Sequence, residues 1–532
     1  MSFLSQKLRW NGGSSRAVRS KPGNSRTGII GFTAAMLVLG GLATALLLGM
    51  VIALGAIQLT AMLAGLLIFI PILLFVDTKK LMPIMFVVVF FIAGSIQFFF
   101  NIRMATWMAS GLCALFFART IFEVSLSNRL RKESLADNSR GATYVIAAAW
   151  IYLAFYVFSI FLGHAKTTQL ISVLRFCLPI FGVLFAMYWF EWSDKRLLML
   201  WWMIVWIVLA QLPLVVYQHF FMMSSLGWDG VVGSFGTSMS PVLVLFTVAG
   251  MLYMLARWVR GITPLWQVVC VFVIGLAIIL LGEVKAVFLW LPFGVFWVLR
   301  RRVMKNLMAF IVFVALMSVT SSAIFMTYHA LYWGEVTKTE TTEDKLNTLG
   351  GYVVNPDNIN YATGEISRGA TLALWYYDPM PTIQERLIGY GPSASLTSQS
   401  VGRGVVAARY RLLQIGSTGL ATLLWDVGIL GTLAYLSIFI LGTLLGIRYV
   451  ARSGASAERL AIADTSTIML MLFLSTLVYN RTLIDEPPMQ LLCYFCLGCI
   501  VQFVRYGKPA TSMPTAGEAA PDHGKTLRGM PA

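Results

Sequence analysis

The chain has 532 residues, of which 58% are hydrophobic and only 12% are charged. This composition excludes a soluble globular protein, because apolar stretches of about 18 residues or more recur throughout and each can cross a bilayer. The formal net charge of +17 would suit a protein that binds nucleic acid. However, the basic residues cluster in the short segments between apolar stretches, which is the usual signal of membrane orientation. We therefore expect a membrane protein with no nucleic-acid partner.

Fourteen apolar segments predict fourteen transmembrane helices. They lie at 29–53, 57–76, 81–100, 105–124, 142–163, 168–190, 197–217, 239–257, 265–281, 285–299, 307–327, 420–446, 465–479 and 488–504. The short alternating strands of a transmembrane barrel are missing from the pattern. Helices satisfy their own backbone hydrogen bonds in lipid, so the expected fold is an all-α polytopic membrane protein.

The basic clusters predict which ends of these helices face the cytoplasm. Residues 1–27 carry basic residues and no acid, and are expected to be a cytoplasmic tail. With the N-terminus inside, residues 28–327 hold helices 1–11 and residues 420–505 hold helices 12–14. The segment 328–419 then falls outside as one large periplasmic loop. Residues 506–532, rich in Pro, Ala and Gly, are expected to be a disordered cytoplasmic tail.

The large loop concentrates arginine. From Arg386 to Gly419 the sequence has four arginines and no acidic residue. The four are Arg386, Arg403, Arg409 and Arg411. Guanidinium groups match the geometry of phosphate and keep their charge, so this group predicts binding of an anionic head group. Some of the four are expected to be ordinary surface charges.

Local patterns give the loop some structure. Ser367–Tyr377 has helical spacing of apolar residues, and Asp378-Pro379 ends that helix. Gly389 and Gly391 flank Tyr390 in a predicted tight turn. Trp375 and Tyr376 suit stacking on sugar faces, or simply a belt of aromatic residues at the membrane interface.

Further ionisable residues lie near the outer ends of the predicted helices. Arg175 lies inside the sixth helix and either faces a cavity or extends to the interface. Glu283 and Lys285 occupy an outer turn, where they could act in chemistry or simply pair. Arg368 opens the helical part of the loop and is either a functional cation or a solvated charge. Asp426 lies two turns into a predicted helix and needs a partner in any interpretation.

Three residues could act as a base, and no metal is expected. Asp378 and His329 are candidates beside Glu283, although a lone interface histidine is more often structural. The sequence has four histidines and no paired metal-ligand motif. Cys493, Cys496 and Cys499 are interpreted as small apolar residues of a buried helix, not as metal ligands. We expect neither metal nor cofactor.

Over residues 140–500 the pattern resembles the superfamily of bacterial O-antigen polymerases and O-antigen ligases. Val232-Gly233-Ser234-Phe235-Gly236 is similar to the family's Gly-Thr-Phe-Gly, and Glu283-Val284-Lys285-Ala286 stands where the family has Ser-Arg-Gly. Arg368, an aromatic helix and Leu387-Ile388-Gly389-Tyr390-Gly391-Pro392 resemble the family's arginine, helix and "pro-leu-x-gly-x-gly" turn. Leu424-Trp425-Asp426-Val427-Gly428-Ile429-Leu430-Gly431 resembles its "leu-x-glu-x-gly-leu-leu-gly".

The sequence also departs from the family. Ligases place a histidine nine residues before the acidic position, where this chain has Ser417. The arginine often found before Gly-Thr-Phe-Gly is missing, with Asp229 nearby instead. The outer loop also lacks an arginine followed eleven residues later by glycine, a spacing reported for some polymerases. The departures favour a polymerase over a ligase.

The resemblance implies a GT-C-like, metal-independent glycosyltransferase in the bacterial inner membrane, with both termini in the cytoplasm. Its expected substrate is an undecaprenyl-diphosphate-linked oligosaccharide, and membrane lipid, the pathway's flippase and its chain-length regulator are expected partners. Lys285, Arg368 and Arg175 would stabilise the diphosphate leaving group. Arg386, Arg403, Arg409, Arg411, Trp375, Tyr376, Gly389 and Gly391 would bind substrate. A ligase that transfers glycan to lipid A-core remains an alternative, as does a lipid-linked oligosaccharide flippase, whose expected mark is two similar halves.

Overall fold

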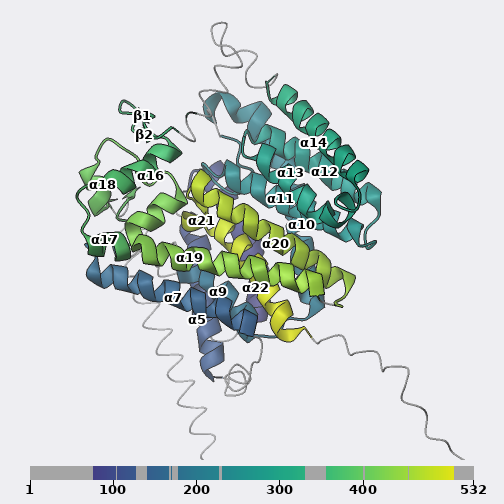
Figure 1. The fold of residues 1–532 in the computed structure, drawn as a ribbon, viewed down its shortest axis with the longest axis horizontal. Coiled ribbons are helices and arrows are strands. Elements are labelled where there is room, and N and C mark those ends of the chain that lie inside the picture. Colours follow the sequence, from purple (N-terminus) through teal and green to yellow (C-terminus); the bar gives the residue numbers. More distant parts are fainter. Residues whose placement is uncertain are drawn as a thin grey trace, which may run out of the picture. The chain divides into compact units, whose positions relative to one another are not determined.

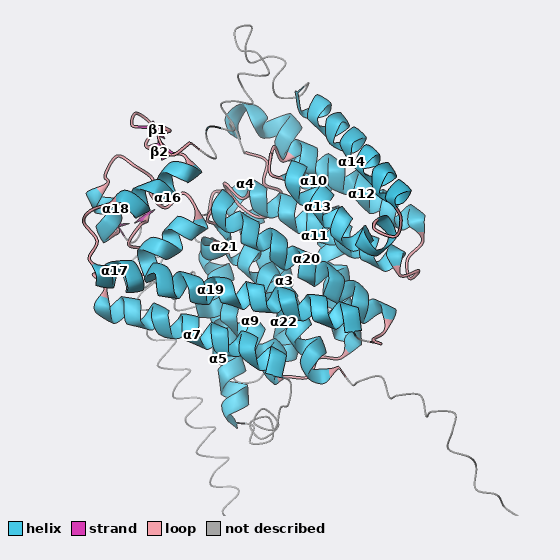
Figure 2. Cartoon of the chain, viewed as in Figure 1, coloured by secondary structure: helices cyan, strands magenta, loops and turns pink. Residues whose placement is uncertain are grey.

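The computed structural model describes residues 49, 76–102, 105–126, 140–166, 169–170, 178–226, 230–329, 351, 355–398, 402–452 and 454–507. Apart from Gly49, all of these belong to one unit that begins at Val76. Helices make up nearly all of it, and the few strands are short (Figure 2). The predicted N-terminal tail, the first two predicted transmembrane helices apart from Gly49 and Val76, Arg175, and residues 508–532 of the predicted C-terminal tail lie outside the described residues.

Each predicted helix from residue 81 onward has a helical counterpart. In chain order these are α3 (Thr78–Val87) continued through the π-helix η1 (Val88–Ile92) into α4 (Ala93–Phe100), α5 (Ala105–Leu126), α7 (Arg140–Leu162), α9 (Leu178–Trp189), α10 (Asp194–Leu226), α11 (Ser240–Val259), α12 (Leu265–Leu281), α13 (Val287–Val303), α14 (Leu307–Tyr328), α19 (Gly419–Arg452), α20 (Ala457–Tyr479) and α22 (Pro487–Tyr506). Within the described part, nine helices are long and apolar enough to cross a membrane, and α12 is a shorter apolar helix. The chain is a multi-pass, all-α membrane protein.

Smaller elements follow α14 and precede α19. They are β1 (Ile359–Asn360), β2 (Glu365–Ile366), α16 (Arg368–Tyr377), α17 (Ile383–Ile388), β3 (Thr397–Ser398), β4 (Gly402–Arg403) and α18 (Val405–Arg409). The strands form two antiparallel pairs, β1 with β2 and β3 with β4. We call residues 355–398 and 402–418 the loop subdomain. A short helix, α21 (Thr482–Asp485), joins α20 to α22.

Two helices hold the bundle together. α19 crosses it from the loop subdomain and packs against α7, α20 and α22 (Figure 1). α22 packs against α9 and α20, and almost all of its side chains are buried. Cys493, Cys496 and Cys499 are buried in α22, in the apolar environment expected from the sequence.

One end of the bundle contains arginines bound to buried acceptors. Arg260 and Arg300 donate to the two carboxylate oxygens of Asp464 over 2.7 and 2.8 Å. These contacts join the C-terminal ends of α11 and α13 to the start of α20. The prediction that this helix begins at residue 465 was wrong, since α20 begins at Ala457. The helix begins there because the Ser456 side chain caps it by accepting a hydrogen bond from the Arg459 amide, and the two arginines neutralise Asp464 inside the bundle.

The opposite end of the bundle, the loop end, carries the loop subdomain. α20 reaches this end at Tyr479, whose carbonyl oxygen accepts a hydrogen bond from Arg368 of α16. The basic residues Arg260 and Arg300 therefore lie at the end of the bundle away from the loop subdomain. The topology predicted from the sequence, with basic segments on one side of the membrane and the large loop on the other, requires this placement.

A turn between α10 and α11 folds back into the bundle. α10 has 33 residues and α11 has 20, so α10 extends about 20 Å farther at 1.5 Å per residue. Residues 230–239 cover this extra length by running back beside α10 before α11 begins. The Ser234 hydroxyl donates to the carbonyl oxygen of Phe90, in the π-helix η1, over 2.7 Å. The segment that is similar to the family's Gly-Thr-Phe-Gly is thus a buried re-entrant turn.

Candidate functional site

The loop subdomain is built around a small apolar core. Tyr390, Ala394, Val406 and Ile415 pack with Trp425 of α19, so the subdomain and the membrane helix share one core. α16 begins because the Ser367 side chain accepts a hydrogen bond from the Ala370 amide, as an N-cap does. The core fixes the position of α16 and α17 against the bundle.

The glycine turn docks directly onto a break in α19. At Gly428 the helix has φ 67° and ψ −171°, a conformation that favours glycine. The backbone amides of Tyr390 and Gly391 each donate over 2.9 Å, to the carbonyl oxygens of Trp425 and Asp426. A Cβ added to Gly389 would lie 2.6 Å from the Gly428 nitrogen. The two glycine motifs of the sequence are therefore the two halves of one backbone contact.

The Asp426 carboxylate anchors the residues that follow this turn. One oxygen accepts from the Ser393 amide over 2.7 Å. The other accepts from the Ser395 amide over 3.2 Å and from the Ser395 hydroxyl over 3.1 Å. The partner that the sequence required for this buried acid is thus the loop subdomain itself, not a cation.

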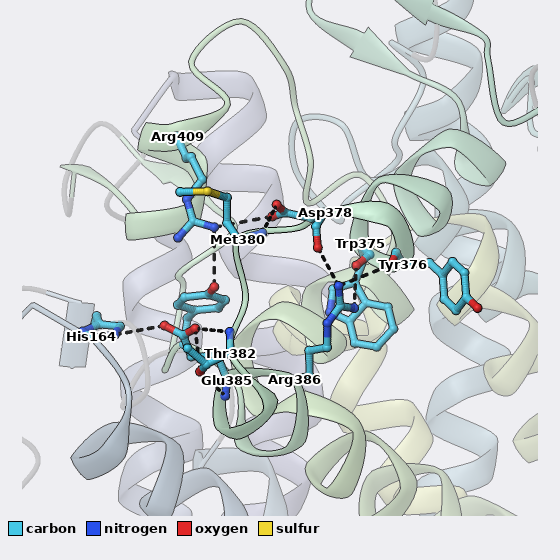
Figure 3. A network of polar contacts seen from close by, with 10 residues as sticks. His164, Trp375, Tyr376, Asp378, Met380, Thr382, Glu385, Arg386 and Arg409 are labelled. Atoms are coloured by element: carbon cyan, nitrogen blue, oxygen red, sulfur yellow. Dashed lines mark hydrogen bonds and ion pairs between the residues drawn. The ribbon is translucent and has the colours of Figure 1, made fainter.

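Arg386 binds backbone at the end of α16. Its guanidinium donates to the carbonyl oxygens of Trp375 over 3.2 Å, Tyr376 over 3.3 Å and Asp378 over 2.6 Å (Figure 3). Carbonyl groups at a helix C-terminus lack partners within the helix, and a cation there satisfies them. This geometry gives Arg386 a structural contact beside its predicted role in substrate binding.

Arg409 and Asp378 form a second polar contact. Arg409 lies 3.4 Å from the Asp378 carboxylate and 3.5 Å from the Tyr390 hydroxyl (Figure 3). Burial, together with a hydrogen bond to Asp378, raises the pKa of Tyr410 to about 12. Asp378 also accepts from the Met380 amide over 3.0 Å. Its carboxylate is thus held by three neighbours.

Glu385 joins the loop subdomain to α7. It forms a capping box with Thr382 and lies 3.1 Å from Nε2 of His164, just after α7 (Figure 3). Burial alone would raise the pKa of Glu385, but hydrogen bonds from Thr382, His164 and Tyr390 outweigh it and lower the pKa below its ordinary value of 4.5. His164 was not among the residues singled out from the sequence.

Glu385→Gln should remove a pH-dependent part of the stability. A carboxyl with a lowered pKa stabilises the folded state above its unfolded pKa, and this contribution is lost as pH falls through the folded pKa. Glutamine keeps the capping-box geometry but not the charge. The difference in unfolding temperature between wild type and variant should therefore shrink as pH falls from 6 to below 4.5. Scanning fluorimetry at each pH measures it, with the exposed Glu365→Gln as control. A difference that is constant with pH would contradict this role.

Arg368 lies where α16 meets the end of α20. Its Nε donates to the carbonyl oxygen of Tyr479 over 2.6 Å, and its guanidinium lies 4.5 Å from the centre of the Tyr479 ring. Tyr479 also contacts Trp290 of α13, with ring centres 5.7 Å apart. Trp290 in turn donates to the Ser475 hydroxyl over 2.9 Å. α13, α16 and α20 thus meet around Tyr479.

Lys285 and Glu283 lie just before α13, at the same end. The Lys285 carbonyl accepts from the Phe288 amide, and Trp290 follows about one turn later. The Lys285 side chain is exposed, whereas Glu283 is buried with φ 58°. His329, at the end of α14, packs on Phe325. Glu283 and Lys285 thus share the turn before α13, and His329 is linked to the start of α13 through Phe325, which also packs on Phe288.

The remaining predicted binding residues lie elsewhere in the loop subdomain. Tyr376 is exposed and Trp375 is half-buried, with the Arg386 guanidinium 5.3 Å from its ring. Arg403 and Arg411 are exposed, and Arg403 donates to the Arg411 carbonyl over 3.2 Å. Gly389 and Gly391 serve the turn.

Sequence reasoning missed Arg481, which follows Tyr479 by two residues. It pairs with Asp485 over 2.9 Å, and about half of its side chain is exposed. The sequence did carry a signal for Arg481, because it is a charged residue between two apolar helices at the loop end, as Lys285 is.

No family model matches the chain, and a search of curated proteins finds no match either.

Proposed function

We propose that the chain is a polysaccharide polymerase of the bacterial inner membrane. It transfers an undecaprenyl-diphosphate-linked oligosaccharide onto a growing lipid-linked glycan at the outer face. In this proposal the chain has fourteen transmembrane helices in a GT-C-like arrangement, and the loop subdomain lies in the periplasm. The resemblance supplies the substrate class, and the grouping of cations around the end of α20 supports it.

The observation that carries the proposal is that α16 and α13 both contact Tyr479, at the end of α20, and so bring Arg368 and the turn that holds Lys285 to the same end of the bundle. Arg368 comes from the loop subdomain and Lys285 from the turn before α13, far apart in sequence. Arg368 contacts Tyr479 directly, and Trp290, on the helix that follows Lys285, packs against the Tyr479 ring. Arg481, on α20's own end, adds a third cation. A group of cations at one end of a membrane bundle suits a lipid-linked diphosphate.

The reaction would need two functions from this site. As the bond between the sugar C1 and the diphosphate oxygen breaks, negative charge develops on the leaving diphosphate, and fixed cations stabilise it. The acceptor hydroxyl forms the new bond to C1 and loses its proton to a base. Glu283 lies in the same turn as Lys285, and His329 is linked to the start of α13 through Phe325 and Phe288; one of the two would take that proton.

Ser417 favours polymerase over ligase. It occupies the position of the ligase histidine, and its hydroxyl lies 2.9 Å from that of Thr371. Thr371 follows Arg368 by about one turn of α16, so this pair of hydroxyls lies beside the proposed cation site. An imidazole that could activate a lipid A-core hydroxyl is replaced by a serine.

Complementation of a gene deletion tests the proposal. Deletion in the native host should abolish long polymer and leave single repeat units on the outer leaflet. Arg368→Ala and Lys285→Ala should each lower polymer formation about 100-fold, the usual cost of removing one stabilising donor from a transition state. Arg368→Lys should restore part of it. The matched control is Lys166→Ala, which removes an exposed cation that follows α7 and belongs to none of the predicted site residues.

Glycan length on the lipid carrier is read by gel and mass spectrometry, with expression and unfolding temperature checked for every variant. Repeat units trapped on the inner leaflet would identify a flippase. Polymer that stays on its carrier and fails to reach lipid A would identify a ligase. Full polymer in the deletion strain would refute the proposal.

A further inference from the structure

A cavity of about 380 Å³ lies between α12, α13 and α14, with the end of α11 behind it. Phe272 and Leu276 line it from α12, Leu291 and Val295 from α13, and Met317 and Ile324 from α14. The polar side chains in its lining are Thr320 and Ser321, and the Thr320 hydroxyl donates to a carbonyl of its own helix. The cavity therefore offers almost entirely apolar surface, which suits a hydrocarbon chain.

The cavity extends along α13. Its lining along α13 runs from Val287 to Leu299, about 18 Å at 1.5 Å per residue. This is more than half of the roughly 30 Å hydrocarbon thickness of a bilayer. α14 forms its outer wall, and no residue in the membrane-crossing stretch of α14 is buried among the described residues. Among the candidate membrane-crossing helices of the described part, α14 is thus the least buried, and it closes one side of the cavity.

A cation lies at the loop end of the cavity. Val287 and Phe288 line that end, and the Phe288 amide donates to the carbonyl oxygen of Lys285 over 3.2 Å. Lys285 thus belongs to the same turn, with its side chain exposed. An apolar channel with a cation at its membrane-surface end matches an amphiphile whose phosphate is joined to a long chain.

We infer that this cavity, the α12–α14 groove, holds the polyprenyl chain of the lipid carrier. The choice of a polyprenyl chain rests on the proposed function. The first 18 Å or so of the chain lies along α13, its phosphate is bound near Lys285, and the rest extends into the bilayer. The groove thereby orients the diphosphate toward Tyr479 and Arg368.

Binding of tritiated undecaprenyl phosphate to the purified full-length protein in detergent tests this inference. Ser321→Trp fills the groove from α14 and should weaken binding at least tenfold. Val319→Trp adds the same ring to the same helix at a side chain that is 68% exposed and outside the lining, and should bind like wild type. Lys285→Ala should weaken binding of undecaprenyl phosphate while leaving that of undecaprenol unchanged. Unfolding temperatures identify any variant that fails to fold.

A second measurement does not depend on the tryptophan variants. Undecaprenyl phosphate with a diazirine on the isoprene units nearest the phosphate should crosslink to peptides within residues 265–324 of the wild-type protein. Crosslinks confined to other helices, or equal binding by Ser321→Trp and wild type, would overturn the inference. Displacement by dioleoylphosphatidylglycerol at equal concentration would also overturn it, since the groove would then hold ordinary phospholipid.

The two proposals can fail separately. The binding assay needs no polymerisation, and the deletion experiment needs no knowledge of the groove. If Ser321→Trp loses binding in the purified protein while the deletion strain still makes polymer, the groove is supported and the polymerase proposal is refuted. If Ser321→Trp binds normally while the deletion strain loses polymer, the groove is refuted and the polymerase proposal is supported.

Discussion

Asp426→Ala is expected to release the turn that follows Gly391 from α19 and to destabilise the folded protein strongly. The carboxylate accepts from two amides and one hydroxyl, and its residue is only 7% exposed. A buried donor without an acceptor costs about 1–3 kcal/mol, so losing all three contacts should cost roughly 3–5 kcal/mol. Asp426→Asn keeps one carbonyl oxygen and should lose less.

The unfolding temperature of purified protein and polymer formation in the host are the two measurements. Asp357→Ala, which removes an exposed acid from the same subdomain, is the control and should match wild type. We expect Asp426→Ala to lose stability and polymer together, because the turn and α16 share one core. A variant with wild-type stability but no polymer would show that Asp426 acts in the chemistry and not as an anchor.

Hydropathy located the helices from residue 81 onward because most of these apolar segments are long enough to cross a bilayer. It placed the start of α20 too late, since Asp464 and its neighbours read as a polar boundary. The charge is tolerated because Arg260 and Arg300 bind the carboxylate, and this pairing joins three helices that are distant in sequence. A hydropathy average over consecutive residues cannot detect partners that are distant in sequence.

The candidate site was predicted less completely. The sequence identified Arg368 and Lys285 as cations, but not that Arg368 and Trp290, which follows Lys285 on α13, would both contact Tyr479. It also grouped Arg386 with the substrate-binding arginines, whereas its guanidinium binds three backbone carbonyls. Which arginine donates to the free carbonyl groups at the end of α16 depends on how α16 and α17 pack, and this packing cannot be read from the sequence alone.

The glycine motifs show the same limit. Gly389 and Gly428 were each expected to make a local turn or a family signature. Their backbones meet, and neither position has room for a side chain. The requirement for glycine at one position is therefore set by the other, about 40 residues away. Two motifs that look independent in sequence act as one structural feature.

Gln218→Met should be as destabilising as the loss of Asp426, for a reason that belongs to the membrane. Gln218 is fully buried on α10; its Oε1 accepts from the amides of Val232 over 2.9 Å and Gly233 over 2.7 Å, and its Nε2 donates to the Gly233 carbonyl over 2.8 Å. Non-helical backbone is tolerated at membrane depth only where protein groups satisfy it. Methionine keeps the length but offers no comparable partner, so the expected cost is roughly 3–6 kcal/mol.

The control is Phe220→Met on the same helix, at a side chain that is 67% exposed and therefore faces lipid or water. Unfolding temperature and the fraction of protein recovered as a monodisperse peak measure the loss. Gln211, which binds Ser234 through both its amide oxygen and nitrogen, should behave like Gln218. If Gln218→Met were as stable as Phe220→Met, the turn would not depend on the glutamine. The segment that is similar to a family signature would then need another explanation than support of buried backbone.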